Sequence, residues 1–259
     1  MTSPNKAIDL IQITLMVVEG LIKFRFILTI ILSFNIIKHM NNYSYVCSER
    51  VIKMKYDVYA KAIWFIFSKD CFNGLAEKNI LINRQFKHSC KNEYKNMIEN
   101  TPSIGRMKEN TMSLILLFAC MIFSIYKTCD NDLTSNDVRN MFQKIEQNPI
   151  MIKFSKKSVF TEKWQSRRQA MAKRSLKNKF EYDWQSELIQ GTNINEFELR
   201  FFTCGICKLA KRENANDIVK ELCRFDYWMA EKMGATLVRN QTIADGSPTC
   251  EFNYHKTEI

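Results

Sequence analysis

The sequence is poor in the residues that break or loosen regular structure. Its 259 residues include only seven glycines and four prolines, which excludes a collagen-like or low-complexity chain and leaves no Gly-, Ser- or Pro-rich linker between two halves. Histidine is scarce too, with three residues far apart, so a His-based triad or a His-rich metal site has little support. Because 46% of the residues are hydrophobic, we expect an ordinary globular core.

The amino terminus lacks a long uncharged run, although residues 1–39 are strongly apolar. Four charged residues interrupt this segment: Asp9, Glu19, Lys23 and Arg25. The longest uncharged stretch, residues 26–37, is shorter than the ~20 residues that a membrane-spanning helix needs, and no secretory signal pattern is present. We expect an apolar extension that forms a buried or interfacial helix. A tilted anchor in contact with a membrane, or a biological start at Met40, are the alternatives.

Acidic residues are nearly missing from one stretch of the chain. Residues 153–179 hold ten Lys and Arg against a single acid, Glu162, and account for most of the net charge of +11. Without a nucleic-acid motif, such a run is typical of a solvated helix face, so we expect no nucleic-acid partner. The nine cysteines are an odd number without a secretory signal, which favours free thiols and a cytoplasmic location.

The first half of the chain predicts helices. Apolar periodicity and breakers place them at residues 45–67, 79–99, 110–126 and 135–147. In the first, Val51, Met54, Val58, Ala62 and Phe65 form one apolar stripe. The third is uncharged over seventeen residues, which predicts a helix buried on all sides. We therefore divide the chain into the extension 1–39, a helical region 40–150, a basic helical connector 151–180 and a cysteine-rich region 181–259.

The cysteine-rich region changes to strand-like periodicity. Alternating runs at 184–190 and 196–202 flank Gly191 and predict a hairpin. A helical pattern over 216–232 ends at Gly234, and two further alternating runs follow at 235–243 and 249–255. The predicted fold class is α+β: a helical amino-terminal region followed by a small antiparallel sheet in ββαββ order, with one helix packed against it.

Four cysteines gather in this region, at Cys204, Cys207, Cys223 and Cys250. As four thiolates they would suffice for a tetrahedral zinc site, which is the one cofactor that these residues suggest. The Cys-x-x-Cys alone is also typical of a redox dithiol, but the hairpin before it is not the βαβ context of a thioredoxin-like protein. Cys223 and Cys250 can equally be small core residues. These alternatives stay open.

An ordered string of residues in this block resembles the L-2-amino-thiazoline-4-carboxylic acid hydrolase family. It comprises Cys204-Gly-Ile-Cys-Lys-Leu-Ala, Leu222, Cys223, Asp226, Tyr227, Gly234, Arg239, Thr242, Ala244, Gly246 and Cys250-Glu-Phe. The resemblance covers residues 180–256, and Pro102, Ile104, Gly105 and Asn110 also match the helical half of the family. At Glu251 the family commonly has Asp, so the carboxylate is retained with a longer reach.

The resemblance implies a hydrolase that opens a small cyclic isothiourea to an N-carbamoyl amino acid. Such a reaction needs a clamp for the substrate carboxylate, an acid–base group, and an activated water or thiolate. The matching positions offer Arg239 as the clamp, with Thr242 and Gly246 in the substrate site. They offer Asp226 or Glu251 as the partner of the amidine or the base, and Cys204, Cys207 or Cys250 as the nucleophile. We expect a small-molecule partner; the oligomeric state stays open.

Two other function classes compete with the hydrolase. One is a non-catalytic module that uses the cysteine cluster to bind a small molecule or zinc. The other is an interaction protein that uses the basic stretch to bind polyanions in a salt-sensitive way. Structural roles are also open for single residues: Asp226 in a helix ion pair, Arg239 in a cross-strand pair, Gly246 in a turn only, and His255 on the surface.

Overall fold

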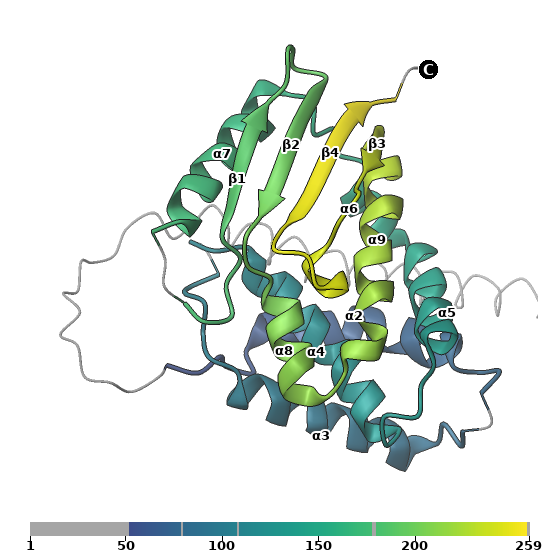
Figure 1. Ribbon diagram of the computed structural model, residues 1–259. Coiled ribbons are helices and arrows are strands. Elements are labelled where there is room, and N and C mark those ends of the chain that lie inside the picture. Colours follow the sequence, from purple (N-terminus) through teal and green to yellow (C-terminus); the bar gives the residue numbers. More distant parts are fainter. Residues whose placement is uncertain (1–51, 79, 108, 178–179, 258–259) are drawn as a thin grey trace, which may run out of the picture. The chain divides into compact units, whose positions relative to one another are not determined.

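A computed structural model describes residues 52–78, 80–107, 109–177 and 180–257 (Figure 1). All of these belong to one compact unit, residues 50–259. The apolar extension 1–39 lies outside the described residues. The helix or membrane contact expected for it, and the alternative start at Met40, therefore lie outside them as well. Within them, no helix combines the length and the apolar character that a membrane span requires.

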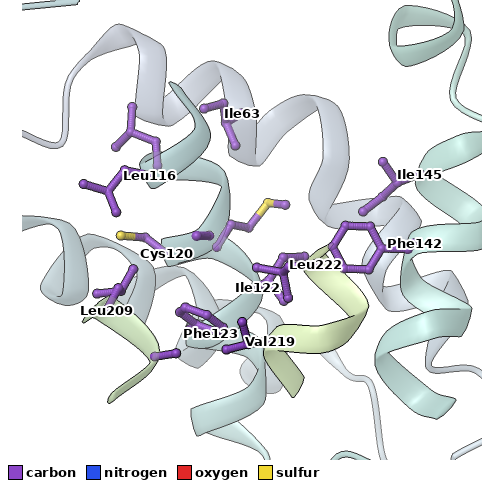
Figure 2. Packing of buried hydrophobic residues seen from close by; sticks show 14 of the residues in the cluster. Ile63, Leu116, Cys120, Ile122, Phe123, Phe142, Ile145, Leu209, Val219 and Leu222 are labelled. Atoms are coloured by element: carbon purple, nitrogen blue, oxygen red, sulfur yellow. The ribbon is translucent and has the colours of Figure 1, made fainter. Parts of the chain in front are cut away.

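The helical region is built around α4, as its uncharged sequence predicts. Within the described residues, six helices precede the sheet: α2 (Val58–Gly74), α3 (Arg84–Asn100), α4 (Met112–Thr128), α5 (Ser135–Glu146), α6 (Pro149–Ser155) and α7 (Glu162–Ser175). Eight consecutive residues of α4, 119–126, are buried, which requires cover on all sides of the helix. Figure 2 shows Cys120, Ile122 and Phe123 of α4 among the side chains of neighbouring helices.

The helix starts are set by capping side chains. Asp57 accepts hydrogen bonds from the amides of Tyr59 and Ala60 and begins α2, so the predicted helix 45–67 starts later and ends later than expected. Of its predicted stripe, Met54 and Ala62 are buried whereas Val58 and Phe65 are exposed. Val51 lies outside the described residues. Helix α5 begins with a capping box, in which the side chains of Thr134 and Asp137 each accept a hydrogen bond from the other residue's backbone amide.

The predicted α+β class is confirmed by a four-stranded antiparallel sheet. Its strands are β1 (Ser186–Gln190), β2 (Glu196–Phe201), β3 (Ala235–Val238) and β4 (Cys250–Lys256), in the order β1-β2-β4-β3. Two helices, α8 (Gly205–Glu213) and α9 (Val219–Lys232), stand where one was expected between the strand pairs. Short 3-10 turns precede α9 (Asn216–Ile218) and β4 (Ile243–Asp245). The predicted strand 235–243 is therefore shorter, ending at Val238.

The sheet has one covered and one open face. On β2, Phe197, Leu199 and Phe201 are buried, and on β4 Cys250 and Phe252 share their face. The intervening residues form the open face, where Arg200 pairs with Glu198. Helix α7 packs beside β1 and α9 packs beside β3. Helices therefore cover the buried face at both edges of the sheet (Figure 1).

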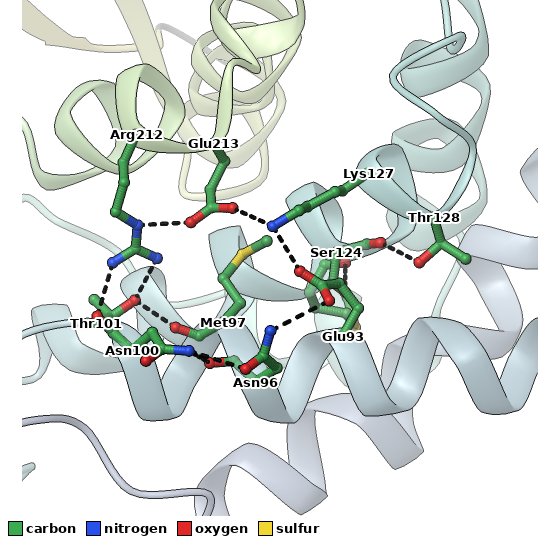
Figure 3. Close-up of polar contacts among 11 residues, drawn as sticks. Glu93, Asn96, Met97, Asn100, Thr101, Ser124, Lys127, Thr128, Arg212 and Glu213 are labelled. Atoms are coloured by element: carbon green, nitrogen blue, oxygen red, sulfur yellow. Dashed lines mark hydrogen bonds and ion pairs between the residues drawn. The ribbon is translucent and has the colours of Figure 1, made fainter.

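Helix α8 is tied to the helical region by a polar network at its carboxyl end (Figure 3). Lys127 of α4 lies 2.9 Å from Glu93 of α3 and 3.0 Å from Glu213 of α8. Arg212 donates to the Asn100 carbonyl at 3.1 Å and to the Thr101 hydroxyl at 2.9 Å. These contacts fix α8, whose amino end carries the Cys-x-x-Cys.

Candidate active site

Helix α9 brings three of the family-matching residues to the covered face. Cys223, Asp226 and Tyr227 follow one another at helical spacing. The helix is held at its start by Glu221, whose side chain is buried and accepts from Arg139 of α5 at 2.9 and 3.1 Å. A bidentate pair of this kind fixes orientation as well as distance. The position of Asp226 is therefore tied to the helical region.

Arg239, directly after β3, is the centre of the site. Its Nη1 donates to Asp226 Oδ2 at 2.9 Å and its Nη2 donates to the Cys223 carbonyl at 2.8 Å. The guanidinium lies 4.8 Å from the ring centroids of both Tyr227 and Phe252, an arrangement that stabilises a cation. Only 5% of the side chain is exposed, and its buried Nε has no hydrogen-bond partner among the described residues.

The Asp226 carboxyl is tuned by two opposing effects. Burial among protein atoms raises its pKa to about 6, while the charge and hydrogen bond of Arg239 act to lower it. The side chain nevertheless stays 40% exposed, so solvent reaches it from one side. Contact with solvent on that side weakens the effect of burial on the pKa. Asp226 is thus a carboxylate that titrates closer to neutrality than an ordinary aspartate.

The cysteines near this pair are held as neutral thiols. Contact with Cys207 and burial raise the pKa of Cys204 well above its usual value, although the amides at the start of α8 act against this. Burial raises the pKa of Cys223, and it raises that of Cys250 to about 11. The Cys250 sulfur accepts a hydrogen bond from the Ile243 amide at 3.1 Å. At neutral pH these three groups are therefore weak nucleophiles.

A second arginine borders the same aromatic surface. Arg168 of α7 lies with its guanidinium 5.4 Å from the Phe201 ring, and that ring is 5.2 Å from the ring of Phe252. Tyr254 lies close enough for Asp226, Arg168 and Arg239 all to affect the pKa of its phenol, which burial raises. The covered face thus carries aromatic rings with one arginine toward each edge, Arg168 on α7 and Arg239 after β3.

Three predicted site residues are used elsewhere. Glu251 alternates with Cys250 and lies on the open face, where it accepts from Gln241 at 3.0 Å and sits 3.8 Å from Arg200. Thr242 is buried and its hydroxyl donates to Asp245 at 2.6 Å. Gly246 has a φ of 89° and ends the turn before β4. The structure therefore brings together Asp226, Arg239, Cys204, Cys223 and Cys250, and leaves these three outside that group.

The described residues that could bind a metal ion do not form a metal site. Among the residues that the structure describes, no three or more His, Cys, Asp or Glu side chains are grouped as a metal ion would require. This holds for the four cysteines considered for zinc, all of which are described. Cys207 lies in the first turn of α8 beside Cys204.

Two contributors to the site were missed in the sequence. Arg168 belongs to the basic stretch, but Gln165, Arg168 and Ala172 are spaced three and four residues apart on the inner face of α7, and that spacing could have singled it out. Asp183 is buried and accepts from both Asn110, at 2.9 Å, and the Trp184 amide, at 2.8 Å. Its pairing joins the start of α4 to the start of the sheet, and no local pattern announces it.

Comparison with known protein families supports the resemblance that these residues carry. A family model for L-2-amino-thiazoline-4-carboxylic acid hydrolase matches residues 115–254, which run from the first turn of α4 into β4 and include every residue of the Asp226–Arg239 group. Searches of curated proteins and of solved structures found no match. The chain belongs to the L-2-amino-thiazoline-4-carboxylic acid hydrolase family.

Proposed function

We propose that this protein is a hydrolase that opens a small carboxylate-bearing cyclic isothiourea, such as L-2-amino-thiazoline-4-carboxylate, to N-carbamoyl-cysteine. The observation that supports it best is the Asp226–Arg239 pair, in which a carboxylate of raised pKa is oriented by a buried guanidinium. Family membership supports the reaction class. An acid–base group with a pKa near the working pH is what water addition to an amidine-like carbon requires.

In the proposed reaction, water adds to the ring carbon between nitrogen and sulfur. Asp226 takes a proton from the attacking water, a carbon–oxygen bond forms, and the carbon–sulfur bond then breaks. The departing sulfur receives a proton, so that one water is consumed and one free thiol appears. The oxygen from water becomes the carbonyl of the carbamoyl group.

Arg239 acts as a positioning residue in this scheme. Both of its Nη groups are engaged, one with Asp226 and one with the Cys223 carbonyl, so neither is free to form a fork with a substrate carboxylate. Its charge keeps the Asp226 carboxyl ionised at neutral pH against the effect of burial. Its Nε is buried and has no hydrogen-bond partner among the described residues.

Water serves as the nucleophile better than a cysteine does here. A cysteine nucleophile acts as the thiolate, and the raised pKa values of Cys204 and Cys250 keep both thiols protonated near pH 7. Their contribution is then to the shape and polarity of the site. The scheme also needs no metal ion.

The first test is thiol release by the full-length protein with L-2-amino-thiazoline-4-carboxylate, followed with a thiol reagent. Asp226→Asn keeps the shape of the side chain but removes the base, so we expect kcat to fall about 10²- to 10⁴-fold. Glu251→Gln is the matched control, because it neutralises the neighbouring family carboxylate on the open face. We expect it to retain wild-type turnover.

Two outcomes would contradict the proposal. A folded wild-type protein that releases no thiol from this substrate or its ring homologues would refute the reaction. Equal losses in Asp226→Asn and Glu251→Gln would show that the carboxylate beside Arg239 has no special part in it.

A further inference from the structure

Arg168 is a partly buried cation with no counter-charge among the residues that the structure describes. Its Nε is buried and has no hydrogen-bond partner among the described residues, and its Nη1 approaches only the Met112 sulfur, at 3.9 Å. Its other close neighbour is the Phe201 ring. Across the part of the chain that the structure describes, no carboxylate lies within ion-pair distance of it. The guanidinium is thus available to an anion.

The chemistry of arginine makes this arrangement unfavourable without a ligand. Burial lowers the pKa of Arg168, yet a guanidinium stays protonated in proteins and cannot escape the cost by losing its charge. Buried charges are normally paired or bound to a ligand. An unpaired one beside a candidate site therefore indicates a place for a negatively charged group of the ligand.

Two aromatic rings lie between Arg168 and the Asp226–Arg239 pair. Arg168 stacks on Phe201, Phe201 contacts Phe252 edge-on, and Phe252 stacks under Arg239. Asp226 and Arg168 both act on the phenol of Tyr254. Arg168 and Asp226 therefore lie toward the same group of aromatic side chains, which comprises Phe201, Phe252 and Tyr254.

We propose that Arg168 binds the carboxylate of the substrate and thereby places the ring carbon toward Asp226. This inference rests on the proposed function for the identity of the ligand. It gives the anion-binding role to the arginine that is free to form new hydrogen bonds, and leaves Arg239 to orient the base. Arg168 is then the residue that selects for carboxylate-bearing substrates.

The surroundings of Arg168 allow this. It lines a cavity of about 20 Å³, room for about one water molecule. Met112 and Met171 also line it, and their flexible thioether side chains can move aside for a larger group. The two carboxylates on its wall have other partners: Asp183 accepts from Asn110, and Glu109 pairs with Arg106. Arg174 adds positive charge to the wall.

The test measures binding directly. Calorimetric titration of the full-length protein with L-thiazolidine-4-carboxylate uses a probe that keeps the carboxylate but lacks the amidine-like carbon. Arg168→Met should weaken binding about 10- to 100-fold, as expected for hydrogen bonds to a charged group. Arg167→Met, the exposed neighbour on the same helix, should bind as the wild type does. Equal affinity in the two variants, or no binding by the wild type, would overturn the proposal.

Three further measurements distinguish a substrate site from a general anion site and from a structural role of Arg168. Acetate should bind at least tenfold more weakly than the ring carboxylate; equal binding would make this a general anion site. Arg168→Met should raise KM for the carboxylated substrate and leave turnover of the decarboxylated ring, 2-amino-thiazoline, unchanged. The variant should also be at least as stable as the wild type, since it removes a buried unpaired charge. A fall in stability would indicate a structural role instead.

These arms also separate this inference from the proposed function. If Asp226→Asn abolishes turnover while Arg168→Met changes neither KM nor binding, the hydrolase stands and the role of Arg168 fails. If the protein binds the probe through Arg168 but releases no thiol, the anion site stands and the hydrolase fails.

Discussion

The protonation state of Asp226 is decided by competition between burial and the charge of Arg239. Removal from water favours the neutral acid, and the guanidinium of Arg239 favours the carboxylate. Since the first effect is the larger, the pKa lies above that of an exposed aspartate, but the charge of Arg239 keeps it near 6. The two residues therefore act as one unit, and the pair can be tested through its titration.

We predict that kcat/KM of the wild type rises with pH through about 6 and levels off above it. The sign follows from the role of Asp226 as a base, which works only when deprotonated. Arg239→Met removes the group that lowers the pKa of Asp226, so this limb should move to higher pH. Arg239→Lys keeps the charge and should leave the limb closer to its wild-type position.

The measurement is a pH–rate profile of the three proteins, each checked for folding by far-UV circular dichroism. An acidic limb at the same pH in the wild type and in a folded Arg239→Met variant would rule out coupling between the two side chains. A limb that moves to lower pH would contradict the assigned direction.

At the scale of elements, the sequence predicted the helices and turns that depend on residues close together in the chain. The hairpin around Gly191 and helix α9 each depend on residues within a few positions of one another, and both are confirmed. The predicted start of α2 was wrong because the capping residue, Asp57, lies inside a longer apolar pattern that begins before it. Helix α8 was missed because it is only nine residues long and starts within the Cys-x-x-Cys.

The candidate site was predictable only in part, for a geometric reason. Adjacent strand residues point to opposite faces of a sheet, so Cys250 and Glu251 cannot both face Arg239. That conclusion was within reach of the sequence once the strand was assigned. The approach of Arg168 to the same surface depends on how α7 packs on the sheet, which is long-range information that no single segment contains.

Gly205, the second residue of the Cys-x-x-Cys, lets the start of α8 approach the sheet. A Cβ there would lie 2.8 Å from the Trp184 ring and would also overlap the Tyr182 carbonyl. We predict that Gly205→Ala displaces the amino end of α8 and destabilises the protein by about 1–3 kcal/mol, as overpacking does. The measurement is urea unfolding followed by tryptophan fluorescence.

Gly246→Ala is the matched control for that substitution. Gly246, unlike Gly205, has a backbone conformation that favours glycine, with a φ of 89°, and a Cβ there would meet no atom within 4 Å. Its cost should come from backbone strain alone, about 1 kcal/mol. If Gly205→Ala is no more destabilising than Gly246→Ala, the close approach to Trp184 does not limit the fold.

At the scale of the whole described unit, the helices and the sheet share one core. The buried hydrophobic cluster runs without interruption from Met54, before α2, to Phe252 in β4. Phe225 of α9 shows the connection, since its ring lies 5.1 Å from that of Phe142 in α5 and 6.5 Å from that of Phe118 in α4. The helix that carries Asp226 is therefore packed on the helical region as well as on the sheet.

This shared core predicts that the cysteine-rich region does not fold alone. Expressed separately, residues 181–259 would expose Phe225 and Leu209, which the helical region now covers, and a fragment of this size buries a smaller share of its surface than the whole unit does. We expect its circular dichroism to lack a cooperative thermal transition, whereas the full-length protein should show tryptophan fluorescence and far-UV signals that change together. Adding residues 50–180 as a second chain should restore the transition if the core is shared. A cooperative transition in the isolated fragment would instead make the sheet and its two helices an independent domain, and would assign the contacts of Phe225 to an interface between domains.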